Sequence, residues 1–129
     1  MKKDIHVVGA VIVENGKILC AQRGEGKTLS YKWEFPGGKL QKGETEEDCL
    51  KREIKEELNI HITIQYKLHP VQHDYGDFQI ELIPFVADYA EGTLQLHEHY
   101  QAGWFAKNEL LNLDWAPADL PILDEFLKI

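Results

Sequence analysis

Short apolar runs and runs of alternating apolar and polar residues predict that strands dominate the chain. In chain order the runs are 7–13, which is continuously apolar and β-branched, 18–22, the alternating runs 60–70 and 77–89, and 103–105. Asn15-Gly16, between the first two runs, is a strong signal for a tight hairpin. Pro36-Gly37-Gly38 predicts a turn with unusual backbone freedom. Pro84 lies inside the fourth run and predicts an edge or a bulge there, since proline cannot donate a hydrogen bond to a neighbouring strand.

Two segments combine helical periodicity with end residues that suit a helix. The first covers 45–58, where Thr45 is a good N-cap and Asn59 tolerates the left-handed conformation that often ends a helix. The second covers 120–128 and has Pro121 in its first turn. Few helices among many strands favour an α+β fold with a central mixed β-sheet.

Three glutamates of the 45–58 helix border its apolar stripe instead of standing opposite it. At ~100° per residue, Glu57 falls ~20° and Glu53 ~60° from Leu50, the first residue of the stripe. The full set is Glu53, Glu56 and Glu57. One interpretation is a solvated acidic face with ion pairs along the helix. We favour a hard divalent cation such as Mg²⁺, because clustered carboxylates repel one another and charge beside a packing face is costly.

The composition fits a single domain over residues 1–129, and 43% hydrophobic residues suffice for a core. A net charge of −8 without a basic patch argues against a nucleic acid polymer as partner, although divalent cations can still recruit phosphates. Cys20 and Cys49 are interpreted as buried free thiols. With no signal peptide and no run of about 20 apolar residues, we expect a cytoplasmic protein without membrane contact.

The segment from Gly38 to Ile60 reads GKLQKGETEEDCLKREIKEELNI and resembles the Nudix box. Its matching positions are Gly38, Glu44, Arg52-Glu53-Ile54, Glu56-Glu57 and Ile60. Asn59 departs from the usual glycine, but both residues adopt the left-handed C-cap. Residues 16–19, 21–23 and 33–38 look like the MutT branch of this family. The tail, with His97-Glu98-His99 and residues 116–121, is similar to the CTP pyrophosphohydrolase subgroup.

This resemblance implies an α/β/α sandwich and a site for Mg²⁺, with Mn²⁺ as a substitute. Water would attack a phosphorus of a nucleoside triphosphate and release a monophosphate and pyrophosphate. The expected substrates are (d)CTP or modified and oxidised (d)NTPs. The implied metal ligands are the Gly38 carbonyl, Glu53, Glu56, Glu57 and Glu98. Glu53 or Glu98 would act as base on the attacking water, and Arg52 would orient Glu53 through a charge-assisted hydrogen bond.

Residues outside the metal site are candidates for contacts with the nucleotide. Arg23 and Lys39 are placed to contact phosphates. Trp33, Tyr75 and Phe78 are candidates for stacking on the base, with a place in the core as the alternative for each. Acidic side chains read cytosine by accepting from its exocyclic amine, and this suits Asp119.

Several roles stay open at this point. Asp119 also suits the N-cap of the last helix. Glu44 either supports the metal site from outside or simply favours the N-terminal end of the 45–58 helix. The pair His97 and His99 is too small a set for zinc, which needs three or four ligands.

Other functions compete with triphosphate hydrolysis. One is hydrolysis of a diphosphate-linked nucleotide such as ADP-ribose. Another is a catalytically idle nucleotide-binding module, which would have no reason to retain three clustered glutamates. Removal of pyrophosphate from RNA 5′ ends fits poorly with the −8 charge. The sequence is compatible with a monomer or a homodimer.

Overall fold

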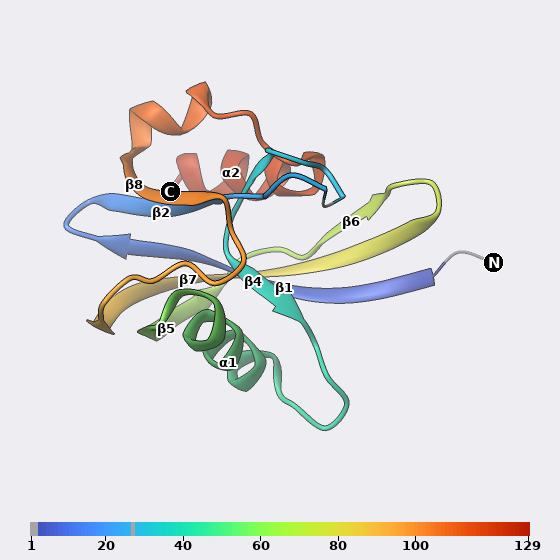
Figure 1. Cartoon of the computed structure of the whole chain (residues 1–129), viewed down its shortest axis with the longest axis horizontal. Helices are drawn as coiled ribbons and strands as arrows, with labels where there is room; N and C mark the ends of the chain where they lie inside the picture. Colours follow the sequence, from blue (N-terminus) through green and yellow to red (C-terminus); the bar gives the residue numbers. More distant parts are fainter. Residues whose placement is uncertain (1–2, 27) are drawn as a thin grey trace.

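A mixed β-sheet lies between helix α1 on one side and helix α2 with two short 3-10 helices on the other (Figure 1). The computed structural model describes residues 3–26 and 28–129. The strands are β1 (Lys3–Glu14), β2 (Lys17–Gln22), β3 (Trp33–Glu34), β4 (Gly37–Lys39), β5 (Ile60–Lys67), β6 (Val71–Asp74), β7 (Phe78–Gly92) and β8 (Gln101–Ala106). The helices are α1 (Glu46–Leu58), η1 (Lys107–Asn112), η2 (Pro117–Asp119) and α2 (Leu120–Leu127). This confirms the α+β class and the α/β/α layering.

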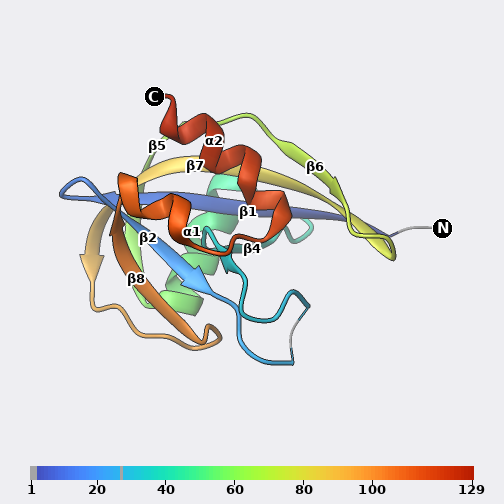
Figure 2. The same ribbon diagram turned by 90° about the horizontal axis from the view of Figure 1, so that it is seen from above.

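Strand β1 is the centre of the sheet, whose main path runs β3-β2-β1-β7-β5. It pairs parallel with β7 and antiparallel with β2 and β4, which makes the sheet mixed. Strands β6 and β8 extend it beside β7 and β2. Asn15 and Gly16 both have positive φ, as a tight hairpin between β1 and β2 requires. Seen from above, β1 and β7 run lengthwise through the molecule (Figure 2).

Side chains of β1 alternate between two hydrophobic cores, one on each face of the sheet. The core beneath α1 contains Val8, Ala10 and Ile12. The core on the other face, beside α2, is packed by Val7, Val11 and Val13. Since successive strand residues point to opposite faces, the apolar run of β1 serves both cores. Each helix buries its own stripe against one of them: Leu50 and Ile54 of α1 are fully buried.

The structure corrects three expectations about the strands. Gly37 and Gly38 do not form a turn: they lie in β4, hydrogen-bonded to β1. Pro84 is not at an edge, because β7 is flanked by β1 and β5; it lies where the partner of β7 changes from β6 to β5. Strand β6 was missed, since it has only four residues and only one of them, Val71, is apolar. Among the described residues, no helix is long and apolar enough to cross a membrane.

Candidate active site

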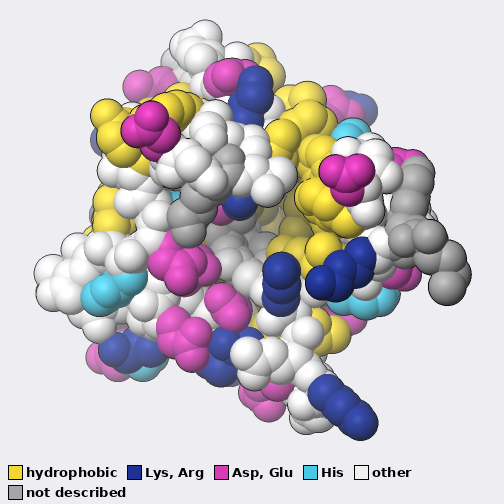
Figure 3. Space-filling view, turned by 45° about the vertical axis from the view of Figure 1, so that its right-hand side comes forward, with side chains coloured by type: hydrophobic (Ala, Val, Ile, Leu, Met, Phe, Trp, Pro, Cys, Tyr) yellow, Lys and Arg dark blue, Asp and Glu magenta, His cyan; other side chains and the backbone are white. Residues whose placement is uncertain are grey.

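A cavity of about 620 Å³ opens between β4, α1, the 93–100 segment and η2. Its volume is in the range of sites for small organic ligands. Five acidic residues are among those that line it: Glu34, Glu53, Glu57, Glu98 and Asp119. Apolar side chains also line it, among them Ile5, Val7, Phe35, Phe78, Ile80 and Leu82. Figure 3 shows a hollow bordered by acidic side chains on one side and by hydrophobic ones on the other.

The ends of helix α1 and its buried stripe determine where its glutamates point. The Thr45 hydroxyl accepts from the Asp48 amide at 3.1 Å and caps the first turn. Asn59 ends the helix in the left-handed conformation, with φ 60°. With Ile54 packed in the core, the adjacent Glu53 and Glu57 face the cavity. The helix predicted from the sequence is therefore confirmed, including both caps.

Strand β4 lies so close to α1 and β1 that side chains at its two glycines would collide with them. A Cβ at Gly37 would overlap the backbone of Val8, and one at Gly38 would overlap the Glu53 carboxylate. Neither glycine has a positive φ, so close approach and not turn geometry explains them. Gly38 thus brings main-chain atoms directly beside Glu53, at the position that the resemblance assigns to a metal-ligand carbonyl.

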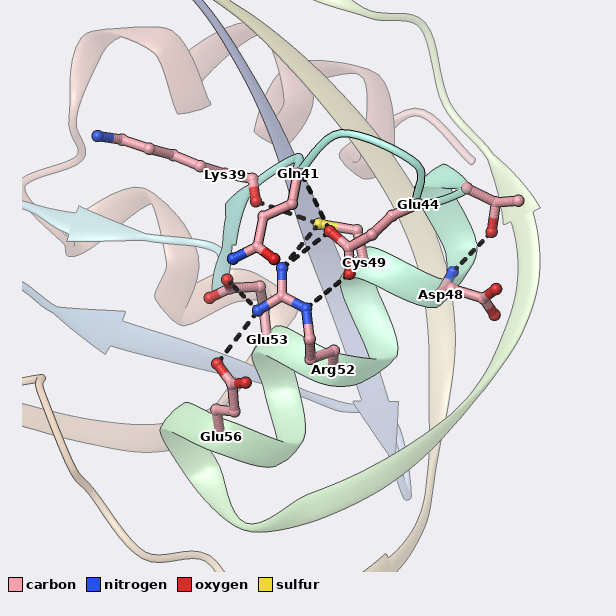
Figure 4. Close-up of polar contacts among 9 residues, drawn as sticks. Lys39, Gln41, Glu44, Asp48, Cys49, Arg52, Glu53 and Glu56 are labelled. Carbon is pink, nitrogen blue, oxygen red and sulfur yellow. Dashed lines mark hydrogen bonds and ion pairs between the residues drawn. The ribbon is translucent and has the colours of Figure 1, made fainter.

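Arg52 holds three carboxylates with one guanidinium (Figure 4). Nε and Nη2 donate to Glu44 at 2.6 and 2.9 Å, while Nη1 donates to Glu53 at 2.8 Å and to Glu56 at 3.2 Å. The bond from Arg52 is the main cause that lowers the pKa of Glu44 to about 2. The Glu53 contact is the one expected for an orienting role. Glu44 accepts from Nε and Nη2 of Arg52 and so holds the arginine in position.

Ionisation of the Glu57 carboxyl group is unfavourable in this environment. Burial, followed by the charges of Glu53, Glu98 and Glu34, raises its pKa to about 9. Its Oε2 is buried, and no donor of the described residues reaches it. Glu98 approaches as a second carboxyl group, and two carboxyl groups can bond only when one of them holds a proton. Burial also raises the pKa of Glu53, with the charges of Glu56 and Glu98 adding to the effect.

The described residues contain no group of three or more His, Cys, Asp or Glu side chains already arranged as a metal site. Glu53 and Glu56 are both turned onto Arg52. The Glu56 side chain is 58% exposed and is not among the described residues that line the cavity. The structure thus gathers Glu53, Glu57 and Glu98 around one cavity and leaves Glu56 at its outer side.

Glu34 and His99 form a partly buried pair that sequence reasoning did not assign to the site. His99 Nε2 lies 2.9 Å from Glu34 Oε2, and Arg23 Nη1 donates to Glu34 Oε1 at 2.9 Å. Burial alone would raise the pKa of Glu34, but the His99 hydrogen bond and the Arg23 charge outweigh it and lower the pKa. Arg23 lines the cavity, yet its guanidinium is already bound to Glu34 and the Thr28 carbonyl. Both cysteines are buried free thiols, as expected.

Asp119 lies in the cavity wall and does not cap helix α2. It has no side-chain cap hydrogen bond and instead accepts from the Phe35 amide at 3.3 Å. Burial, followed by the charge of Glu34, raises its pKa well above its ordinary value. The raised pKa favours the protonated form, in which Asp119 presents both a donor and an acceptor.

The remaining candidates divide between cavity and core. Tyr75, Phe78 and Lys39 line the cavity, and the Tyr75 hydroxyl accepts from the Ala118 amide at 3.0 Å. Trp33 is 9% exposed and packs edge-on against Phe105 in the core. It is not among the described residues that line the cavity. The structure therefore places Trp33 in the core, which was the alternative to stacking on the base.

Residues 3–126 match the NUDIX domain family. The chain therefore belongs to the Nudix family, and it is a hydrolase. It is 38% identical to the CTP pyrophosphohydrolase of Escherichia coli K12 over 127 residues, which cover 98% of this chain and 94% of the relative. It is 30% identical to the 8-oxo-dGTP diphosphatase of the same organism over 132 residues, which cover both chains fully.

Solved structures of similar proteins share the fold over nearly the whole chain. The E. coli ORF135 protein has a TM-score of 0.86 at 38% identity, with 98% of this chain and 91% of that chain covered. A MutT protein of methicillin-resistant Staphylococcus aureus 252 has a TM-score of 0.80 at 42% identity, with 99% and 98% covered. These likenesses support both the family and its α/β/α fold.

Proposed function

We propose that this protein is a Mg²⁺-dependent nucleoside triphosphate pyrophosphohydrolase that acts on (d)CTP or on modified or oxidised (d)NTPs. The observation that carries the proposal is the cavity, which is lined both by clustered carboxylates and by apolar and aromatic side chains and has the volume of a site for a small organic ligand. The names of the two E. coli relatives, one acting on CTP and one on 8-oxo-dGTP, support a triphosphate as substrate.

The donor set fits a hard divalent cation. Glu57 has a buried oxygen without a donor and a pKa raised to about 9, which is costly unless a cation compensates the charge. Oxygen ligands are those that Mg²⁺ prefers, and Mn²⁺ accepts similar ones. The residues that would hold it are the Gly38 carbonyl, Glu53, Glu56, Glu57 and Glu98. Glu56 stays in the set because it lies one helical turn from Glu53, whose pKa its charge raises.

The bound cation would lower the pKa of water and neutralise phosphate charge. Residues of the protein orient the metal-site carboxylate and accept the proton. Arg52 holds the Glu53 carboxylate in place, and Glu98 accepts the proton of the attacking water. The water oxygen forms a bond to phosphorus in the triphosphate chain, and the bridging P–O bond breaks. The products are a nucleoside monophosphate and pyrophosphate. Lys39, at the edge of the cavity, contacts the phosphates.

The base would lie against aromatic side chains that line the cavity. Phe78 and Tyr75 offer apolar faces for it. Protonated Asp119 can donate to a ring nitrogen and accept from an exocyclic amine, a pattern that the N3 and N4 atoms of cytosine satisfy together. Ionised Glu34 is a second acceptor for an amine. Uracil has a carbonyl oxygen in place of this amine, and the ionised Glu34 cannot donate to it, so we expect cytosine nucleotides to be preferred over uracil nucleotides.

A hydrolysis panel with Mg²⁺, with products identified by phosphorus NMR, tests the proposal. The panel contains the ordinary ribo- and deoxynucleotides, 5-methyl-dCTP, 8-oxo-dGTP and ADP-ribose. We expect pyrophosphate and a monophosphate, with cytosine nucleotides ahead. Turnover of ADP-ribose alone would replace the substrate class. No turnover of any compound would favour an idle nucleotide-binding module.

A further inference from the structure

The segment between β7 and β8 carries Glu98 to the cavity and is fixed on both sides of it by backbone hydrogen bonds. The His97 amide donates to the Glu57 carbonyl at 3.2 Å, at the end of α1. The Tyr100 amide donates to the Gln22 carbonyl at 2.9 Å, at the end of β2. Glu98 and the residue after it lie between these two anchors, so their placement depends on side-chain contacts.

His99 supplies such a contact from inside the protein. Its side chain is only 6% exposed, and its Nε2 lies 2.9 Å from Glu34 Oε2. Since the Glu34 carboxylate is ionised and can only accept, Nε2 carries the proton and donates. Arg23 holds the other oxygen of Glu34, so the acceptor is itself fixed. The bond joins β3 to the Glu98 segment across 65 positions of sequence.

The second ring nitrogen of His99 shows that packing alone does not account for this residue. Nδ1 is buried, and no described residue hydrogen-bonds to it. A buried polar atom without a partner is destabilising, and an apolar side chain of similar size would avoid that cost. Among the residues that the structure describes, the hydrogen bond that a histidine adds here over an apolar residue is the one to Glu34.

We propose that His99 is a positioning residue, which holds Glu98 toward Glu57 by fixing the 93–100 segment to Glu34. Glu98 and Glu57 line the same cavity, and the charge of Glu98 contributes to the raised pKa of Glu57. This inference rests on the proposed function, because that function makes Glu98 the acceptor of the water proton. A displacement of about 1 Å at such a group can cost a hundredfold in rate. Displacement of Glu98 should therefore lower kcat and leave substrate binding largely unchanged.

A pair of variants changes the reach of a side-chain amide by one methylene group. In His99→Gln the amide nitrogen takes a position near that of Nε2, whereas in His99→Asn it reaches only as far as Nδ1. We expect His99→Asn to lower kcat for CTP about tenfold or more, with KM changed less than about twofold. His99→Gln should restore kcat to within about threefold of wild type. His97→Ala, which removes an exposed side chain on the other side of Glu98, is the control with unchanged kcat and KM.

Hydrogen exchange of the His97 and Tyr100 amides, whose hydrogen bonds anchor the segment, gives a second and independent readout in protein without metal or nucleotide. We expect faster exchange in His99→Asn and wild-type exchange in His99→Gln. Wild-type kcat in His99→Asn, or equal loss in both variants with unchanged exchange, would overturn the positioning role. If His99→Asn does not fold, His99→Gln still decides through its kcat and exchange. A wild-type protein that hydrolyses no nucleotide would refute the proposed function instead, and the exchange data would still test the anchor.

Discussion

Arg52 and Glu44 face each other as a two-point ion pair, with Nε to Oε2 at 2.6 Å and Nη2 to Oε1 at 2.9 Å. The pair leaves only Nη1 of the guanidinium for Glu53 and Glu56. Glu44 thus fixes the plane of the arginine, and the arginine then fixes the carboxylate that faces the cavity. Of the two roles that the sequence left open for Glu44, the structure favours support of the site from outside.

Arg52→Lys should uncouple this arrangement without removing the positive charge. A lysine ammonium is a single point of contact and cannot replace the planar fork that binds Glu44 and Glu53 together. We expect kcat to fall about tenfold to a hundredfold, because Glu53 loses its fixed orientation. Steady-state kinetics on CTP measures this, with exposed Lys51→Arg as the control. Unchanged kcat in Arg52→Lys would mean that the contact is only a structural ion pair.

The same pair predicts how stability responds to acid. The folded-state pKa of Glu44, about 2, lies below its ordinary value of 4.5. Stability from the ionised group is therefore fully present above about pH 4.5 and is lost as the pH falls toward 2. Urea unfolding across this window should show a smaller loss in Glu44→Gln than in wild type. Exposed Glu47→Gln should follow the wild-type curve. Parallel curves for wild type and Glu44→Gln would contradict the assignment.

Local sequence signals predicted the helix that carries the glutamates, because its periodicity, N-cap and C-cap all lie within 15 residues. Contacts between distant segments could not be predicted in this way. Nothing near Gly38 shows that its Cβ would collide with Glu53. His99 was considered only as half of a zinc motif, since its partner Glu34 lies 65 positions away. Such pairs are set by the packing of strands and loops, which pattern reasoning does not resolve.

Glu57→Gln should abolish most activity and stabilise the metal-free protein. The folded-state pKa of Glu57, about 9, lies above its ordinary value of 4.5. The stability that it contributes when protonated is full below about pH 4.5 and is lost as the pH rises through 9. Glutamine keeps the shape and removes that charge. We expect a gain of about 1 to 3 kcal/mol for the metal-free variant at alkaline pH.

Thermal unfolding at several pH values, with and without Mg²⁺, tests this assignment. Wild type should lose stability between about pH 4.5 and 9 without metal and regain it when Mg²⁺ is added. Glu57→Gln should show little of either effect. A variant with wild-type turnover and an unchanged melting temperature would refute Glu57 as a metal ligand.

Asp119→Ala should change base preference more than overall rate. The protonated carboxyl group loses its donor and its acceptor together, and a good two-point contact to a base discriminates by about 1–3 kcal/mol. We expect kcat/KM for CTP to fall about tenfold to a hundredfold, while that for UTP changes less than about threefold. Asp119→Asn keeps one donor and one acceptor, so it should retain part of the preference for cytosine.

Asp119→Ala also leaves the Phe35 amide without its acceptor, which should lower the free energy of unfolding by about 1 kcal/mol. An equal fall for CTP and UTP, in step with lower stability, would show that Asp119 shapes the cavity wall without reading the base.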